Sequence, residues 1–170
     1  CDMELNIGAE GTTGPAITVS TCCEGLEGAV LNIHSGNMDI TSTDDCLNAA
    51  NSDLGDYAFE INISGGTIKA YSSEGDGFDS NGTLTITGGD ISVWTANAAD
   101  NQPLDADGRI TISGGTVLAA GGSAGMGFSI SASQPYVTFG GGRDSSLSLA
   151  GGAAFSIADE SGKSVLDSTA

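Results

Sequence analysis

The sequence predicts an all-β protein folded as a parallel β-helix, which is a solenoid of stacked coils, and two observations carry this prediction. First, an apolar residue followed directly by an acidic or small polar one recurs at intervals of roughly 20 to 30 residues, a range typical of repeat architectures. Second, most of these pairs are followed by two short alternating segments joined by a turn. The six pairs are Met3-Glu4, Leu26-Glu27, Leu47-Asn48, Phe78-Asp79, Leu104-Asp105 and Phe128-Ser129.

The alternating segments place apolar and polar residues in turn, as a strand with one buried face does. Glycine pairs separate the two strands of each later copy and can supply the positive φ angles of a tight turn. In the first copy, Gly36-Asn37 takes this place. The copies span residues 30–40, 60–70, 83–93 and 109–119, and their glycine pairs are Gly65-Gly66, Gly88-Gly89 and Gly114-Gly115.

An array of β-hairpins would use the same turns, so it is the alternative to a solenoid. A hairpin array does not require a third element at the same period, however, and the apolar-acidic pair is such an element. Two strands and one pair give three short faces per coil, and stacked coils share a continuous core. We expect about six or seven coils over residues 1–135. Abundant glycine (27 residues) and scarce aromatic side chains (5%) agree with this architecture.

From Tyr136 onward the apolar-acidic pair is missing. Residues 136–170 read as short strands that end in a hairpin-like segment, ADESGKSV (158–165), with Ser161-Gly162 as the turn signal. Because the end of a β-helix is an open strand edge, we expect these strands to form a C-terminal cap of the same domain.

Charge limits the classes of partner. The chain has 22 acidic residues against four basic ones, which gives a formal net charge of −18. Without a basic patch, neither nucleic-acid binding nor attraction to an anionic membrane is expected, and we expect no direct insertion into a membrane.

The acidic residues cluster at the repeat period rather than being scattered. In stacked coils, carboxylates of neighbouring strands would lie about 4.8 Å apart and repel one another in the absence of cations. Ca²⁺ takes about six to eight oxygen ligands from carboxylates, amides, carbonyls and water. The pattern therefore predicts Ca²⁺ at one corner of the coils. The clusters are Glu24 with Glu27, Asp44 with Asp45, Glu74 with Asp76 and Asp79, and Asp100 with Asp105 and Asp107.

The four cysteines, Cys1, Cys22, Cys23 and Cys46, all lie in the first coils. Pairing Cys1 with Cys22 and Cys23 with Cys46 would join neighbouring coils, whereas a Cys22–Cys23 bridge would leave the other two separated by two coil spacings, beyond the usual disulfide span. Disulfides imply an oxidising, extracytoplasmic setting. The competing interpretation makes Cys1 the lipidated first residue of a bacterial lipoprotein.

Several motifs recur at the corners and near the end of the chain: EGLEG (24–28), DDCLNA (44–49), GDGFDSNG (75–82), QPYVTF (134–139) and ADESGKSVL (158–166). These motifs resemble those of a bacterial carbohydrate-binding β-helix family that binds cellulose and pectin-type polysaccharides. The resemblance implies a secreted, right-handed, Ca²⁺-containing β-helix of pectate-lyase-like shape. The chain departs from the family pattern at Cys46, where the family has glycine, and in the degenerate copy NQPLDADG (101–108).

By this resemblance the matched corner positions would be metal ligands. Together with Asp105 from the charge clusters, the expected metal residues are Glu24, Glu27, Asp44, Asp45, Asn48, Asp76, Asp79 and Asp105.

Three functions remain open for such a protein. The first is a non-catalytic, extracellular or cell-surface module that binds a cellulose-like or pectin-like polysaccharide, with Trp94, Tyr57 and Tyr71 as stacking residues. The second is a structural or adhesive subunit that forms a homo-oligomer or filament through stacked ends. The third is a polysaccharide lyase, for which Arg109 is the basic residue nearest in sequence to an acidic corner. Because a single base without partners is weak evidence for catalysis, we expect no enzyme.

Overall fold

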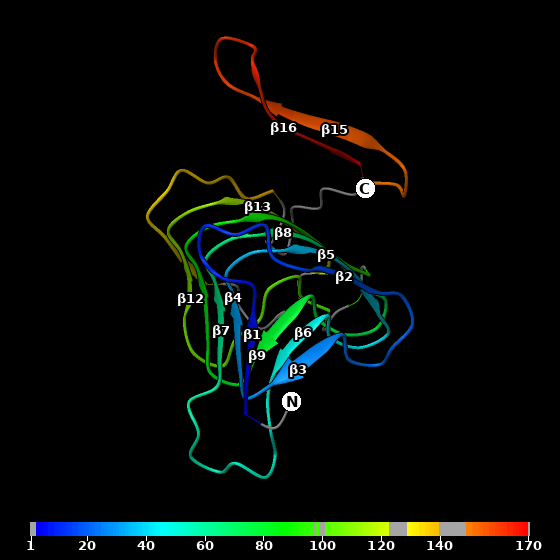
Figure 1. Ribbon diagram of the computed structural model, residues 1–170. Helices are drawn as coiled ribbons and strands as arrows, with labels where there is room; N and C mark the ends of the chain where they lie inside the picture. The colour runs from blue at the N-terminus through cyan, green and yellow to red at the C-terminus, as the bar shows by residue number, and fades with distance from the viewer. Residues whose placement is uncertain (1–2, 97, 99–100, 123–128, 140–148, 170) are drawn as a thin grey trace. The chain divides into compact units, whose positions relative to one another are not determined.

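The computed structural model describes residues 3–96, 98, 101–122, 129–139 and 149–169 of the chain. Within these ranges no helix forms, and the strands build three parallel sheets and one antiparallel hairpin. The parallel sheets stack into a β-solenoid of about four turns. Figure 1 shows the strands following one another around successive coils.

Among the described residues, successive coils contribute strands to three sheets, of six, five and three strands. Sheet A contains β1 (Glu4–Ile7), β4 (Val30–Ile33), β7 (Glu60–Ile63), β10 (Thr83–Ile86), β12 (Ile110–Ile112) and β14 (Ile130–Ala132). Sheet B contains β2 (Ala16–Val19), β5 (Asn37–Ser42), β8 (Thr67–Ser72), β11 (Asp90–Thr95) and β13 (Thr116–Ala120). Sheet C contains β3 (Leu26–Gly28), β6 (Leu47–Ala49) and β9 (Phe78–Ser80).

The prediction of six or seven coils was too high. Three of the apolar-acidic pairs lie in sheet C, and a fourth extends it, because Leu104 forms an isolated parallel bridge with Phe78. The first pair, Met3-Glu4, instead leads into β1 of sheet A. Phe128 of the last pair lies outside the described residues. The shared sequence pattern therefore overstated the number of coils.

The core runs through the solenoid and is built from the inward-facing residues of all three sheets. Parallel register places like residues over like, for example Ile33, Ile63 and Ile86 in sheet A. These side chains are almost fully buried, as are Phe78 and Leu104 from sheet C. Stacked aliphatic columns bury apolar surface on every coil, which is the main stabilising contribution expected for a solenoid.

The glycine turns between sheets A and B form a column of their own. Gly36, Gly66, Gly89 and Gly115 have φ values of 132°, 93°, 102° and 80°. Only the second glycine of each later pair thus takes a positive φ, and in the first copy Gly36 does so while Asn37 begins β5. A side chain at Gly66 would also approach the Gly36 carbonyl oxygen to 3.1 Å.

Buried hydroxyls shape the turn from sheet B to sheet C. Ser42 and Ser72, in register at the ends of β5 and β8, both donate to the Asp44 carbonyl, at 2.6 and 2.7 Å. Thr95 does the same one coil later, donating to the Asn101 carbonyl at 2.7 Å. These hydrogen bonds tie the ends of the sheet B strands to the Asp44 and Asn101 carbonyls. They therefore help to position Asp45 and Gln102, the residues that come next in the chain.

The chain divides into two compact units, Cys1–Tyr136 and Val137–Ala170. The second unit contains the hairpin of β15 (Ala154–Ala158) and β16 (Ser164–Thr169), which confirms the predicted turn. Gly162 has a φ of 83°, and the Asp159 carboxylate accepts hydrogen bonds from the backbone N–H groups of Ser161 and Lys163.

Candidate metal centre

Two columns of oxygen-bearing side chains run across the coils at sheet C. The register of β3, β6 and β9 aligns Glu27 with Asn48 and Asn48 with Asp79. The Phe78–Leu104 bridge extends this alignment to Asp105, whose N–H donates to the Phe78 carbonyl at 2.8 Å. We call Glu27, Asn48, Asp79 and Asp105 the second column, because another column lies three residues earlier in the chain.

The first column consists of Glu24, Asp45, Asp76 and Gln102, each two residues before the apolar residue of its coil. Backbone hydrogen bonds join its rungs. Asp45 accepts from the Asp76 N–H at 2.7 Å, and Asp76 accepts from the Gln102 N–H at 2.5 Å. These pairs are 31 and 26 residues apart in the sequence. The register, not the spacing, therefore brings them together.

Carboxylates of the two columns, together with Asp44 beside them, form two groups that could each hold a metal ion. Glu24, Asp44 and Asp45 form the first group, and Asp76, Asp79 and Asp105 form the second. Within each group, one ligand atom of every residue lies within 4.8 Å of the others. Six of the eight predicted metal residues thus fall into these groups. The other two, Glu27 and Asn48, lie in the second column beside them.

Burial and mutual repulsion make several of these carboxyls reluctant to ionise. Burial is the largest cause of a raised pKa for Glu24 and Asp76, to about 7 in each case, and for Asp79, to about 6. Neighbouring carboxylates add to the effect, and Asp45 acts on all three residues. The pKa of Asp45 itself is raised, again mainly by burial. Such a concentration of buried negative charge favours a bound cation.

In the part of the chain that the structure describes, two oxygen atoms at this corner are buried without a hydrogen-bond partner. They are Oε2 of Glu24 and Oδ1 of Asn48. A buried acceptor without a donor costs free energy, and a cation contacting these oxygens would remove that cost. The donor set consists of carboxylate and amide oxygens, which suits a hard cation such as Ca²⁺ better than a thiolate-seeking metal.

The structure corrects the predicted cysteine pairing. Cys22, Cys23 and Cys46 are free thiols, so the Cys23–Cys46 bridge is not formed, and Cys1 lies outside the described residues. The reason is direction. Cys46 points into the core, is fully buried and contacts Ser42 Oγ at 3.1 Å. Cys23 instead is exposed and lies 3.9 Å from an Asp44 carboxylate oxygen.

The predicted aromatic residues separate into two places. Tyr71 and Trp94 are partners in the register of β8 and β11 in sheet B. Tyr57 instead lies in the loop between β6 and β7, where its ring is 6.0 Å from that of Phe59. Arg109, the residue considered for a lyase, is exposed directly before β12 of sheet A, a different sheet from the acidic columns.

Sequence reasoning missed the part played by Gln102, whose backbone N–H continues the first column where the acidic pattern ends. The detectable signal was its position two residues before Leu104, matching Asp76 before Phe78.

Comparison of the chain with known protein families, with curated proteins and with solved structures gave no match. Among the described residues, no helix is long and apolar enough to cross a membrane.

Proposed function

We propose that this protein is a non-catalytic polysaccharide-binding module whose solenoid is stabilised by Ca²⁺ at the acidic columns. The observation that carries the proposal is the convergence of two three-carboxylate groups on neighbouring coils of one corner. Ions at these positions would offset the repulsion between coils and satisfy the orphaned oxygens of Glu24 and Asn48.

In this proposal, polysaccharide binds at the solvent-exposed surface of this corner. Asp44 and Glu27 are exposed, so a cation held there retains access to solvent and to an outside ligand. A uronate carboxylate can supply the missing oxygen ligands of Ca²⁺, which lets an anionic pectin-like chain approach a protein of net charge −18. The motif resemblance to cellulose- and pectin-binding β-helices supports the same class, as well as an extracellular or cell-surface location.

Two finer features of the architecture belong to this proposal. We infer a right-handed solenoid, because connections between parallel strands of one sheet are almost always right-handed. We also infer that the hairpin serves as a cap. Phe155, Ile157 and Leu166 alternate with exposed residues, which gives the hairpin one apolar face, and an isolated hairpin is at best marginally stable in water.

Calcium-dependent stability tests the metal part of the proposal. Thermal melting should shift upward with Ca²⁺ relative to chelator, by about 2.7 kcal/mol of free energy when Ca²⁺ is at about 100 times its Kd. Replacing Asp79→Asn should reduce this shift and raise the melting temperature in chelator, because one repelling charge is removed. Asp167→Asn, outside the columns, is the control. Identical melting curves with and without Ca²⁺, with no bound metal found on analysis, would reject the metal site.

Retention on polysaccharide tests the binding part. Pull-down on polygalacturonate and on cellulose, with Ca²⁺ or with chelator, should show retention without release of unsaturated sugars. Absorbance from such sugars, lost in Arg109→Ala, would instead support a lyase.

A structural subunit is the second candidate, favoured by the ends of the solenoid. Leu5, Ile17 and Val19 of the first coil, and Val117, Ala119 and Ile130 near the last, are only partly buried against the core. End-to-end stacking would cover such residues. Concentration-dependent polymers in sedimentation or electron microscopy, combined with no binding to either polysaccharide, would favour this candidate.

A further inference from the structure

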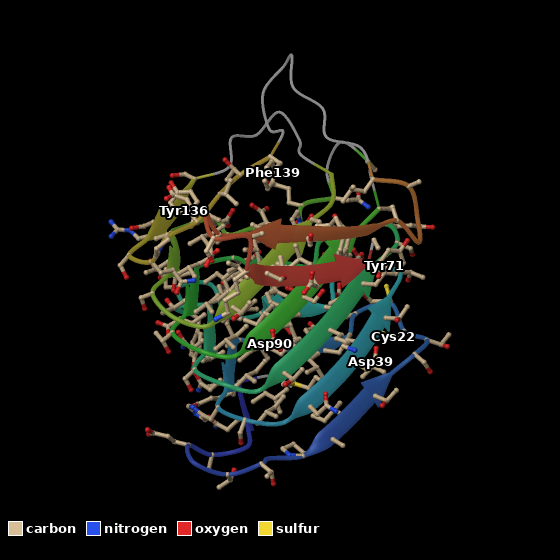
Figure 2. The ribbon with its side chains drawn as sticks, turned by 90° about the horizontal axis from the view of Figure 1, so that it is seen from above. Cys22, Asp39, Tyr71, Asp90, Tyr136 and Phe139 are labelled. Atoms are coloured by element: carbon tan, nitrogen blue, oxygen red, sulfur yellow. The ribbon has the colours of Figure 1, made fainter. Side chains whose placement is uncertain are left out.

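The outer face of sheet B carries a row of residues that crosses its strands at right angles and includes two aromatic side chains. We call it the aromatic row. In the register of β5, β8, β11 and β13, the residues Thr41, Tyr71, Trp94 and Ala120 follow one another on successive coils. Tyr71 is 44% exposed and Trp94 is half-buried. Neighbouring strands lie about 4.8 Å apart, so the two rings occupy adjacent rungs. Figure 2 looks onto this sheet and labels Tyr71 on β8.

The indole of Trp94 is held along its own strand. Its Nε1–H donates to Ser92 Oγ at 3.0 Å, and Ser92 lies two residues earlier on the same face of β11. The ring therefore folds down along the strand instead of standing away from the sheet. An aromatic ring fixed in this manner loses little conformational entropy when a flat apolar ligand surface stacks on it.

The charges beside the aromatic row nearly balance. Asp39 and Lys69 are exposed and directly in register on β5 and β8, and Asp90 lies at the start of β11 (Figure 2). These groups and the Ser92 hydroxyl can hydrogen-bond sugar hydroxyls. The carboxylate excess of sheet C is absent from the described residues of this row. Within a chain of net charge −18, the face suits an uncharged ligand better than an anionic one.

We propose that the outer face of sheet B binds a neutral β-linked glycan that runs along the solenoid axis, with successive sugar rings stacked on Tyr71 and Trp94. This inference rests on the proposed polysaccharide-binding function and separates two ligand classes by surface. Uronate chains bind through Ca²⁺ at sheet C, whereas neutral glucan binds at sheet B without metal contact. The axial direction follows from the register, because only a chain crossing the strands meets both rings.

Affinity electrophoresis through gels containing hydroxyethyl cellulose, run at saturating Ca²⁺ to keep the fold constant, tests the proposal. Tyr71→Ala and Trp94→Ala should each weaken binding about tenfold, the effect of losing one stacking contact. Tyr136→Ala is the control, since its side chain is 66% exposed and lies after β14, outside sheet B, and it should bind like the unmodified protein. Ca²⁺-dependent melting of every variant verifies that the fold is retained.

A gain of affinity tests the axial direction. Thr41→Trp places a third ring on β5, in register with Tyr71, and should tighten binding several-fold. Thr18→Trp on β2 is in register with Asp39 instead, outside the aromatic row, and should not tighten binding. The proposal is overturned if Tyr71→Ala binds like the unmodified protein, if Tyr136→Ala weakens binding equally, or if the unmodified protein is not retarded by neutral glucan. In the last case, Ca²⁺-dependent retention on polygalacturonate still decides the broader function by itself.

Discussion

Cys46 shows how one side chain can be placed by its neighbours in the coil stack. Its register equivalents are Gly25 and Gly77, and a Cβ at Gly25 would collide with the Cys46 carbonyl oxygen. A Cβ at Gly25 or Gly77 would also meet the core side chains of Ile40 or Val93, so this register position faces inward, and the Cys46 side chain is fully buried there. Burial also raises the pKa of its thiol to about 11, which keeps it unreactive.

Thiol labelling should therefore distinguish the cysteines. We expect a small alkylating reagent to modify exposed Cys23 rapidly in the folded protein and Cys46 only after denaturation. Peptide mass spectrometry of a timed labelling reaction measures this difference, with Cys46→Ser as the control for peptide assignment. Equal labelling rates at Cys23 and Cys46 in native buffer would contradict the inward placement, and a recovered Cys23–Cys46 disulfide would restore the bridge.

The raised pKa values of the corner carboxyls give the metal-free protein a defined pH dependence. Glu24, Asp76 and Asp79 have ordinary values of 4.5, 3.8 and 3.8 and folded pKa values of about 7, 7 and 6. At pH values between the ordinary and the folded pKa, the folded state binds more protons than the unfolded state. The free energy of unfolding therefore falls as pH rises through this range. The contribution is complete below about pH 4 and is lost through pH 6 to 7.

In chelator, the protein should consequently melt at a higher temperature at pH 5 than at pH 8. Ca²⁺ should reverse this order, because it binds the ionised carboxylates. Calorimetry at both pH values, with and without Ca²⁺, measures the effect, and the triple replacement of Glu24, Asp76 and Asp79 by their amides should flatten the chelator profile. A metal-free protein that gains stability from pH 5 to pH 8 would contradict the shifts.

At the scale of the element, strands of sheet A are joined by an amide ladder as well as by their backbones. Asn32 donates to Asn6 Oδ1 at 3.1 Å, and Asn62 donates to Asn32 Oδ1 at the same distance. Glu4 and Glu60 accept the remaining amide protons, at 2.8 and 2.9 Å. The polar outer row thus fixes the same register that the aliphatic core fixes from inside.

The column of positive-φ glycines in the turns between sheets A and B also constrains how the coils align. Gly66→Ala should destabilise the protein by about 1–3 kcal/mol, because the native φ of 93° is strained for a side-chain-bearing residue. Gly55→Ala is the matched control, since a Cβ there meets no atom within 4 Å. Urea unfolding monitored by circular dichroism measures both. A Gly66 variant as stable as the Gly55 variant would show that the turn does not require glycine.

For the whole molecule, the core and the metal corner depend on the same contacts. Phe78 is the largest fully buried side chain among the described residues, and its bridge to Leu104 places Asp79 and Asp105 side by side. Coils in a solenoid stabilise their neighbours through shared interfaces. A substitution that disrupts core packing in one coil is therefore expected to weaken cation binding as well as to lower the free energy of unfolding.

Phe78→Ala should cost about 3–5 kcal/mol of unfolding free energy and should also reduce the Ca²⁺-dependent shift. Phe139→Ala is the control, because this side chain is 60% exposed and surface changes usually alter stability by less than about 0.5 kcal/mol. Denaturant unfolding with and without Ca²⁺ measures both effects. An unchanged calcium shift in a folded Phe78 variant would separate the core from the metal corner.

The sequence by itself determined the elements. Alternation in segments such as residues 83–93 defines strands with one buried face, and the Gly-Gly pair between the two strands defines the turn, because both depend on residues close in the chain. The parallel solenoid and the acidic corner follow from the same repeat. The sequence did not determine the number of coils, since Met3-Glu4 shares the apolar-acidic pattern but leads into sheet A.

Only the tertiary structure decided which side chains meet. Asp45 and Asp76 are 31 residues apart while Asp76 and Gln102 are 26 apart, yet both pairs form neighbouring rungs, because the loop between β6 and β7 takes up the added length. The direction of Cys46 and the adjacency of Tyr71 and Trp94 likewise depend on register. Register is set by packing between coils, and those contacts join residues that no local pattern connects.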